Sequence, residues 1–422
     1  MSKKYRSNEE NSKIKILLYC INFAPELVGI GKYAGEMTQW LNNEGHIIRV
    51  ITGHPYYPQW KIEANNKNFS YKVEYLMGAR VYRCPLWVPS NPTGFRRLVH
   101  MFVFAISSIP AVIRQLTYRP DIFMVIEPPF CILPFAVFIS KLFRWSLWLH
   151  IQDLEIDAAF DIGIIRNKLF YNLLLAVERM CIRRCIRIST ISKAMATRIN
   201  SKGVNRSKII YFPNWVDTTQ IYPLTKKSSL RIEMNLSDNE IIVLYSGNIG
   251  EKQGLDDIIE AAKLLSENSN IKFIFCGRGA AYGRLRRMSY NLDNVMWIPL
   301  KPIDRLNDLL NLADIHLIPQ KDKVSDLVMP SKLTGIFSSG RVAIATAPIE
   351  SELARTVEGR GIVVPPSNPV LLAQEILRLS NNITIRLILG AKARQYAIRV
   401  LEKQNILETF KNNILSICKN SK

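Results

Sequence analysis

The chain has 422 residues, more than one hydrophobic core usually fills, and this length predicts two domains of about 200 residues each. Its apolar content of 48% is typical of a globular protein, and its 56 Lys and Arg residues exceed its 35 Asp and Glu residues by 21 charges. Such an excess attracts nucleotide diphosphates, other polyanions or an anionic membrane surface. The seven cysteines are scattered along the chain, which indicates a reducing compartment. Cys181 and Cys185 lie one helical turn apart, but no second pair of cysteines or histidines accompanies them, which argues against a metal site.

Residues 1–13, MSKKYRSNEENSK, form a polar tail that we expect to be disordered. The tail contains no apolar core, so we expect neither a secretory signal nor a membrane anchor there. After it, short apolar runs alternate with longer amphipathic segments, which is the pattern of a parallel sheet covered by helices. The strands expected in the first half are Ile14–Ile21, Ile47–Thr52, Arg80–Cys84, Ile122–Ile126, Ser146–His150, Ile186–Thr190 and Ile209–Phe212.

A glycine-containing loop follows the first expected strand. Gly29, Ile30 and Gly31 lie in the run NFAPELVGIGKYAGEM and formally match a dinucleotide-binding fingerprint. Two features argue against a nicotinamide site: the glycines are separated from the strand by a long connection, whereas the dinucleotide turn is tight, and the second strand ends in Thr-Gly-His without a carboxylate for the ribose. We therefore predict a phosphate-type loop and not a site of hydride transfer.

Two uncharged stretches, Leu98–Ile113 and Pro128–Ser140, are shorter than the roughly 18 to 20 apolar residues that span a bilayer. Basic residues flank both stretches: Arg96, Arg97, Arg114, Lys141 and Arg144. This arrangement favours peripheral contact with anionic lipid. The alternative is a pair of core helices whose basic ends extend into solvent.

His150 ends the strand expected at Ser146–His150. Ligands of parallel sheets bind beyond the carboxyl ends of the strands, so His150 is a candidate site residue, although a structural histidine is the alternative. Asp153, Glu155 and Asp157 follow within seven residues. We expect one or more of these carboxylates to orient an acceptor hydroxyl, and a solvated acidic loop is the alternative for Glu155.

Near residue 213 the sequence becomes polar and irregular, with two prolines in PNWVDTTQIYPLTKKSSLRIEMNLSDNE, which predicts an interdomain linker. A second alternation follows, with strands expected at Ile241–Tyr245, Ile271–Cys276, Val295–Ile298, Ile315–Ile318, Val342–Ala345 and Gly361–Val364. We place the domains at residues 14–217 and 218–395. Residues 396–422 are expected to form a C-terminal helix that crosses back and packs on the first domain.

The first loop of the second half, in IIVLYSGNIGEKQG at residues 241–254, is the most informative stretch. An apolar strand runs into a glycine-punctuated turn that carries Asn248 and Lys252, and a helix opens at Leu255. Backbone N–H groups, the positive end of the helix and the Lys252 ammonium together suit a diphosphate. The alternative is an ordinary strand-to-helix connection, but a second loop of this kind near the N-terminus favours two nucleotide-binding domains.

Another glycine-flanked segment, CGRGAAYGRL, follows the next expected strand. Arg278 lies there between two glycines, and we expect Gly277 and Arg278 to contact the base or a phosphate. An exposed turn arginine is the alternative. Three arginines on the helix that follows are expected on a solvated face: Arg284, Arg286 and Arg287.

Several segments together resemble the family 4 retaining glycosyltransferases, and most closely the branch that includes the colanic acid biosynthesis glycosyltransferases. They are YCINFAPELVGIGKYAGEM, TGHPYYPQW, LHIQDLEIDAA, ISTISKAM, FPNWVD, LYSGNIGEKQGL and MPSKLTGIFSSGR. The resemblance implies the α/β GT-B architecture, with two Rossmann-like doubly wound domains facing a cleft. It also implies catalysis without a metal ion or other cofactor, a nucleotide sugar held mainly by the C-terminal domain, and an acceptor held mainly by the N-terminal one.

The resemblance also assigns roles to residues. It places His150 against the donor sugar as a catalytic residue. Among the carboxylates that follow His150, we take Asp153 as the catalytic candidate. It brings the amides of the loop at Gly29, Ile30 and Gly31 to the diphosphate that Lys252 and Asn248 approach from the other domain.

The chain departs from the wider family in its C-terminal domain, where many members carry two glutamates seven residues apart. Here Pro330, Ser331 and Lys332 stand in this region, as in the branch named above, and no such glutamate pair exists. We expect Ser331 to cap a helix whose first amides face the donor, and Lys332 to present a cation where others have a carboxylate. Recognition of the ribose, and the identity of the donor, therefore cannot be transferred.

The sequence thus predicts a metal-independent, retaining glycosyltransferase of the hexosyl or deoxyhexosyl type. Its expected partners are a nucleotide sugar, a glycan or polyprenyl-diphosphate-linked acceptor of the exopolysaccharide or O-antigen type, and anionic lipid on the inner face of the plasma membrane, with the protein in the cytoplasm. The alternative enzyme is a nucleotide-sugar epimerase of GT-B type. The basic residues form no stripe interleaved with aromatic residues, so we do not expect nucleic acid as a partner.

Overall fold

Two sheets organise the chain in the computed structural model, which describes residues 13–62, 69–90, 92–161, 167–251, 253–321 and 329–420. The strands of the first sheet are β1 Lys15–Tyr19, β2 Ile47–Gly53, β3 Lys72–Leu76, β4 Ala79–Cys84, β5 Ile122–Glu127, β6 Ser146–Ile151, β7 Arg187–Thr190 and β8 Ile209–Tyr211. The strands of the second are β9 Ile241–Ser246, β10 Ile271–Cys276, β11 Val295–Ile298, β12 Ile315–Pro319, β13 Val342–Thr346 and β14 Ile362–Val364.

The strand orders are those of doubly wound sheets. The first order is β3-β4-β2-β1-β5-β6-β7-β8, and the second is β11-β10-β9-β12-β13-β14. Every pair in the second sheet is parallel, whereas β3 joins the first sheet antiparallel to β4. The order reverses between β1 and β5 and again between β9 and β12, and ligands of such sheets bind beyond the carboxyl ends of the strands at these points.

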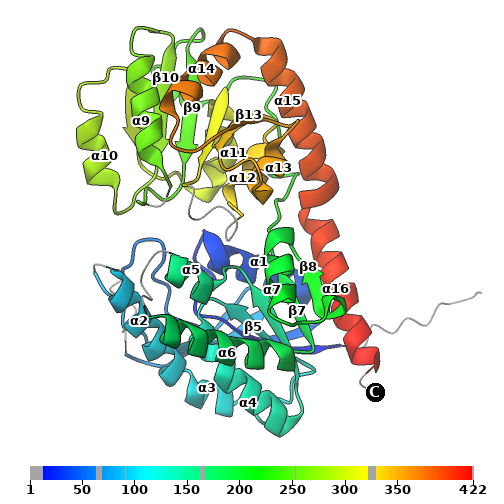
Figure 1. Cartoon of the computed structure of the whole chain (residues 1–422). Coiled ribbons are helices and arrows are strands. Elements are labelled where there is room, and N and C mark those ends of the chain that lie inside the picture. The colour runs from blue at the N-terminus through cyan, green and yellow to red at the C-terminus, as the bar shows by residue number, and fades with distance from the viewer. Residues whose placement is uncertain are drawn as a thin grey trace, which may run out of the picture. The chain divides into compact units, whose positions relative to one another are not determined.

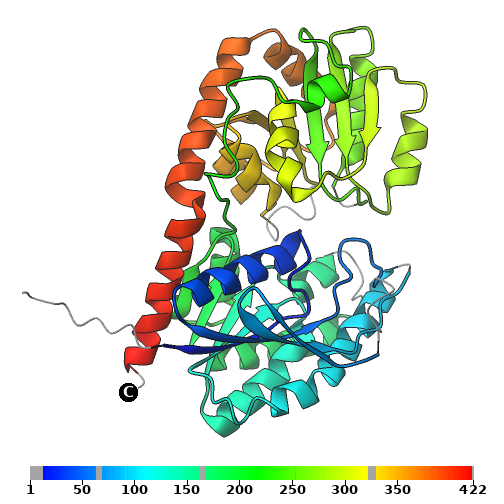
Figure 2. The ribbon, with the colours of Figure 1, turned by 180° about the vertical axis from the view of Figure 1, so that it is seen from behind.

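Helices cover both sheets. The helices up to residue 201 are α1 Gly29–Asn43, α2 Gly94–Ser107, α3 Ile109–Ile113, α4 Leu133–Phe143, α5 Glu155–Asp161, α6 Lys168–Arg184 and α7 Lys193–Ser201. Those that follow are α8 Leu230–Glu233, α9 Leu255–Leu264, α10 Tyr282–Met288, α11 Leu306–Leu312, α12 Lys332–Ser338, α13 Glu352–Val357, α14 Pro369–Ser380, α15 Ile383–Tyr396 and α16 Lys403–Asn420. Helices α2, α3 and α4 lie on one side of the first sheet (Figure 1), and α1 covers its strands in the view from behind (Figure 2).

The chain folds into two compact units. The first contains the chain as far as His150, together with Ala176–Ile188 and the end of α16 from Asn413. The second contains Ile151–Leu175 and Ser189–Asn412, and therefore the whole second sheet. The domain boundaries predicted at residues 217 and 395 stay predictions, and most of the N-terminal tail lies outside the described residues.

Strand β9 is apolar because helices bury both of its faces. Val243 and Tyr245 pack on one side with Ile258 of α9, while Ile242 and Leu244 pack on the other with Leu309 of α11. Strands of this kind read as continuous apolar runs without alternation, which is why β9 was predictable from sequence.

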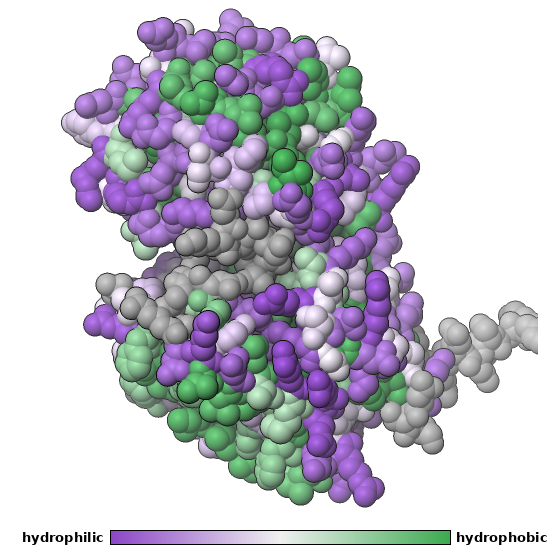
Figure 3. Space-filling view, in the orientation of Figure 1, coloured by the Kyte–Doolittle hydropathy of each residue, from purple (hydrophilic) through white to green (hydrophobic). Residues whose placement is uncertain are grey.

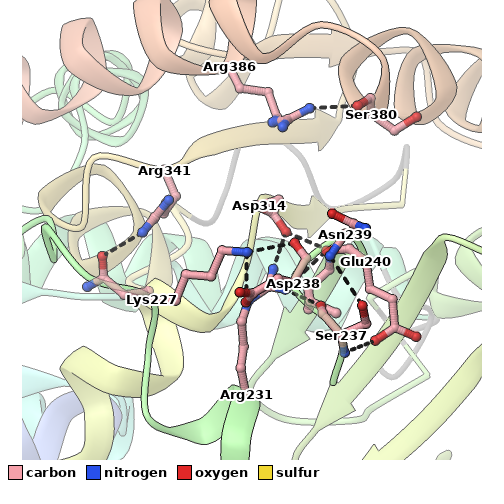
Figure 4. A network of polar contacts seen from close by, with 12 residues as sticks. Lys227, Arg231, Ser237, Asp238, Asn239, Glu240, Asp314, Arg341, Ser380 and Arg386 are labelled. Atoms are coloured by element: carbon pink, nitrogen blue, oxygen red, sulfur yellow. Dashed lines mark hydrogen bonds and ion pairs between the residues drawn. The ribbon is translucent and has the colours of Figure 1, made fainter. Parts of the chain in front are cut away.

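A buried arginine fixes the amino end of β9 (Figure 4). Arg231 Nη2 donates to Asp314 Oδ2 over 2.6 Å, and Arg231 Nη1 donates to the carbonyl oxygens of Ser237 and Glu240 over 3.0 and 3.1 Å. The same Asp314 oxygen accepts the backbone N–H of Ile242 over 2.9 Å. The segment before β9, predicted as an irregular linker, is thus held to the sheet by charge-assisted hydrogen bonds.

Helix α2 begins earlier than the uncharged stretch suggested. With α3 it forms a helical run from Gly94 to Ile113 of 20 residues, which by length and composition alone is enough to cross a membrane. The uncharged stretch is itself as short as expected, and the helix is longer because it extends past Arg96 and Arg97, where the uncharged run ends. Part of the run is core, however: His100, Phe104 and Val112 are fully buried.

Candidate active site

The loops that follow β9 and β10 continue to pair beyond the ends of the two strands. Gly247 N–H donates to the Cys276 carbonyl over 2.9 Å, and Ile249 N–H donates to the Arg278 carbonyl over 2.9 Å. A Cβ atom on Gly277 would lie 1.9 Å from the Gly247 carbonyl oxygen. No side chain fits there, so Gly277, predicted to bind the donor, has a packing role that is sufficient to explain it.

Lys332 reaches this pair of loops from the start of α12. Its Nζ atom lies 4.0 Å from the centre of the Tyr245 ring and 3.2 Å from the position that a Cβ on Gly247 would take. The Tyr245 hydroxyl in turn donates to the Asn248 carbonyl over 2.6 Å. The structure therefore brings Lys332 and Asn248, two of the predicted site residues, to the carboxyl end of β9.

Burial removes water from the Lys332 ammonium, which lies over the Tyr245 ring. This desolvation lowers the pKa of Lys332 to about 7. An anion that binds beside Lys332 would favour the charged form and raise that pKa again. A lysine in this state is well suited to meet a ligand that carries its own negative charge.

Helix α9 starts beside the same loops. Gly254, whose φ of +69° suits glycine, precedes it, and a Cβ on Gly254 would lie 3.4 Å from Lys321 Cγ, just after β12. The loops after β9 and β12 thus meet where the strand order reverses. Lys252, the predicted catalytic and diphosphate-binding lysine, lies outside the described residues.

The acidic residues around this helix end are neutralised by an arginine. Arg284 of α10 donates to Asp256 and, over 2.6 Å, to Glu251. The hydrogen bond from Arg284 lowers the pKa of Asp256. The Arg284 side chain is 39% exposed, as expected for a solvated face, but no pattern within its own helix indicates the two carboxylates from the preceding turn and helix that lie beside it.

Two further predicted residues are exposed. The Arg278 guanidinium lies 4.7 Å from the Tyr282 ring centre and faces solvent. Ser331 precedes α12, but its side chain accepts no capping hydrogen bond, so that part of its predicted role was wrong. Ser331 has helical backbone angles, and its carbonyl accepts the Thr334 hydroxyl over 2.9 Å instead.

In the first unit, the glycines near residue 30 open α1. Gly29 has a φ of +59°, and a Cβ on Gly31 would lie 2.6 Å from Glu26 Cβ. Glu26 is buried and accepts the backbone N–H groups of Tyr56 and Tyr57, each over 3.0 Å. Burial raises the pKa of Glu26. The glycines therefore serve at least the packing of Glu26, and the contact predicted between residues 29–31 and a diphosphate stays a prediction.

His150 lies at the end of β6 and is buried, and Asp153, in the loop that follows, is half-buried. Asp157 is also buried, and it pairs with Lys202 and, over 2.9 Å, with Arg198. Asp157 is thus a structural residue, which leaves Asp153 and Glu155 as candidates for an acceptor contact. The roles predicted for His150 and Asp153 stay predictions.

A cavity of about 410 Å³ lies in another part of the second unit, between Arg360 and Lys392, and none of the predicted site residues lines it. Within the described ranges, no group of three or more His, Cys, Asp or Glu side chains is placed to hold a metal ion.

Comparison with known proteins identifies both halves of the chain. Residues 28–215 match a family model described as a glycosyl transferase 4-like domain, and residues 226–396 match one described as glycosyl transferases group 1. The putative colanic acid biosynthesis glycosyl transferase WcaI of Escherichia coli K12 is 39% identical over 414 residues, which is 95% of this chain and 100% of that protein.

Solved structures share the fold at low sequence identity. The sucrose-phosphate synthase of Thermosynechococcus elongatus superposes with a TM-score of 0.77 at 15% identity, covering 96% of this chain and 99% of the other. Anabaena HepE in complex with UDP and glucose gives a TM-score of 0.69 at 13% identity, covering 96% and 100%. Together with the two doubly wound, mostly parallel sheets, these likenesses confirm the predicted GT-B fold.

Proposed function

This chain belongs to the family 4 glycosyltransferases of GT-B fold, and from this premise we propose that it moves a hexosyl or deoxyhexosyl group from a nucleotide diphosphate sugar to an exopolysaccharide acceptor with retention of configuration. Glycosyltransferase activity in a polysaccharide biosynthesis branch follows from the family. The donor, the stereochemistry and the acceptor are the proposed parts.

The observation that carries the proposal is the cluster formed by Lys332, Tyr245 and the turn at Asn248, at the carboxyl end of β9. Cleavage of a sugar–diphosphate bond places negative charge on the leaving group, and a fixed cation with exposed amides stabilises that charge. Lys332 and the amino end of α9 supply it from the described residues, and Lys252 lies in the same turn of the sequence.

The bond changes of the proposed transfer balance without a protein nucleophile. The acceptor hydroxyl oxygen bonds to the anomeric carbon, the bond from that carbon to the diphosphate oxygen breaks, and the acceptor proton passes to the leaving diphosphate. His150 would hold the donor sugar, and Asp153 would orient the acceptor hydroxyl. Because fixed cations compensate the leaving group, we propose that no metal ion takes part.

We further propose that the acceptor is carried on a polyprenyl diphosphate at the cytoplasmic face of the plasma membrane. The excess of 21 positive charges supports this location, because the cytoplasmic leaflet is anionic. The 39% identical relative reported above is a glycosyl transferase by name, and the alternative of an epimerase finds no support there.

The proposal is tested with a panel of UDP- and GDP-sugars in the presence of lipid-linked acceptor, with nucleotide release and product anomericity as readouts. We expect nucleotide release with one donor and only in the presence of acceptor. The new glycosidic linkage should have the same anomeric configuration, α or β, as the sugar in the donor. Release of an inverted product would contradict retention, and no release with any donor would contradict the proposed reaction.

A matched pair of lysine variants locates the donor site. Lys332→Met keeps the side-chain stem over Tyr245 and removes the charge, so we expect UDP or GDP to bind about tenfold more weakly or worse. Lys272→Met, on β10, removes a lysine whose Nζ donates to the Asp293 carbonyl over 3.5 Å, and we expect unchanged binding. Equal binding by both variants in titration calorimetry would place the donor elsewhere.

A further inference from the structure

Large apolar side chains line the outer side of α2 and α3. Four of them are between 49% and 75% exposed: Phe95, Phe102, Ile106 and Ile113. They are spaced by seven, four and seven residues, which places them along one stripe of the helical run. The buried residues of α2, His100 and Phe104, lie at other positions and hold the helix to the sheet.

Helix α4 extends this apolar surface. Phe138, Leu142 and Phe143 are between 41% and 61% exposed. The turn before α4 contacts α2, since Cys131 Sγ lies 3.4 Å from the Met101 carbonyl. In the space-filling view the apolar colour gathers on the face that α2, α3 and α4 occupy in Figure 1 (Figure 3). We refer to these seven exposed side chains as the apolar face.

The charges on the same helices are all of one sign. Helices α2, α3 and α4 contain no Asp or Glu. Exposed cations stand in or next to these helices: Arg96, Arg97, Arg114, Lys141 and Arg144. An apolar face whose own helices carry cations and no carboxylates matches a surface that offers hydrocarbon beneath negative headgroups.

The charges also distinguish among possible occupants. A second copy of the chain placed face to face would bring these cations against an identical set, and like charges at an interface oppose association. Insertion of α2 as a spanning helix would remove His100 and Phe104 from the core. Lying on the surface of an anionic bilayer satisfies the apolar residues and the cations together.

We propose that the apolar face of α2, α3 and α4, with its bordering cations, is the surface through which this protein docks on an anionic lipid bilayer. These helices would be the part of the protein that makes the membrane contact named in the proposed function. The proposal rests on that function only in assuming a lipid-linked acceptor. Docking needs neither donor nor turnover, so it can be tested separately.

The test is co-sedimentation with phosphatidylcholine vesicles that contain or lack phosphatidylglycerol. We expect the protein to bind the anionic vesicles and to be released from them by salt, and to bind the neutral vesicles at least roughly tenfold more weakly. Equal binding to both vesicles, or none to either, would overturn the proposal.

Two double variants place the contact. Phe102→Ser with Ile106→Ser removes two exposed apolar side chains, and we expect binding to anionic vesicles to fall by roughly tenfold or more. The control, Ile232→Ser with Tyr290→Ser, changes two residues of the second unit that are also exposed, and we expect no loss. Equal binding by the two double variants would contradict this placement.

Two measurements separate failure of docking from other failures. Binding of UDP or GDP to the Phe102/Ile106 double variant should equal that of the unaltered protein, which shows that the fold and donor site are intact. Light scattering of the unaltered protein without lipid should show no self-association through the apolar face, that is, none that Phe102→Ser with Ile106→Ser would abolish. Association of that kind would assign the apolar face to a second copy and overturn the proposal.

Discussion

At the scale of single residues, Gly277 has no room for a side chain because the loops after β9 and β10 pair through their backbones. A Cβ atom would lie 1.9 Å from the Gly247 carbonyl oxygen, and a backbone atom cannot move as a flexible side chain does. We therefore expect Gly277→Ala to lower the free energy of unfolding by about 2–3 kcal/mol in urea titrations.

Gly283→Ala is the matched control for this prediction. Gly283 lies within helix α10, where an added Cβ would approach only the flexible end of Arg287, at 3.8 Å. Alanine favours helix, so we expect a gain of about 0.5–1 kcal/mol there. Equal effects of the two substitutions would show that the two loops do not pack as described.

Lys332 gives donor binding a dependence on pH. Its pKa in the free protein is lowered to about 7, so the ammonium is charged below that pH and increasingly neutral above it. A bound diphosphate favours the charged form, and affinity for UDP or GDP should therefore fall by up to about tenfold per pH unit just above pH 7.

Titration calorimetry across this range checks the sign and the source of the effect. Lys332→Met, which cannot titrate, should bind weakly with a flatter profile between about pH 7 and pH 8. Affinity that rises with pH in the unaltered protein, or an unchanged slope in the variant, would show that Lys332 does not meet the diphosphate.

At the scale of elements, the strand β9 depends on Arg231, which joins Asp314 to the carbonyl oxygens of Ser237 and Glu240. Its side chain is 6% exposed, and Asp314 Oδ2 accepts from both Arg231 and Ile242 N–H. Arg231→Met would leave a largely buried carboxylate without its cation, so we expect a loss of about 3 kcal/mol in the free energy of unfolding.

A surface arginine provides the comparison. Arg378 pairs with Glu375 three residues earlier on α14, and both are partly exposed to solvent. Arg378→Met should change the free energy of unfolding by less than about 0.5 kcal/mol. A similarly small effect of Arg231→Met in thermal or urea unfolding would mean that β9 is not anchored through this arginine.

The elements were largely predictable because most strands are buried on both sides. β10 and β11 match their predicted bounds. β3 was missed because KVEYL mixes charged and apolar residues, as an exposed antiparallel edge strand does. The predicted cap at Ser331 failed because its backbone continues the helix.

At the scale of the whole molecule, the sequence predicted two doubly wound sheets, and it located part of the candidate site. The turn at Asn248 was identifiable because strand, glycines and helix follow one another directly. The contact of Lys332 with Tyr245 joins segments 87 residues apart, and no local pattern indicates it. The partners of Arg284 were missed for the same reason.

The positive charge that the whole chain supplies to the leaving group determines whether transfer requires a metal ion. The charge that grows on the leaving diphosphate requires compensation, and the chain offers Lys332, the amino end of α9 and, in sequence, Lys252. We therefore expect transfer measured in EDTA to stay within about twofold of its rate in Mg²⁺ or Mn²⁺. A rate abolished by EDTA and restored by either ion would show that a metal supplies the positive charge, whereas a rate lost in Lys332→Met and not restored by either ion would assign that charge to the protein.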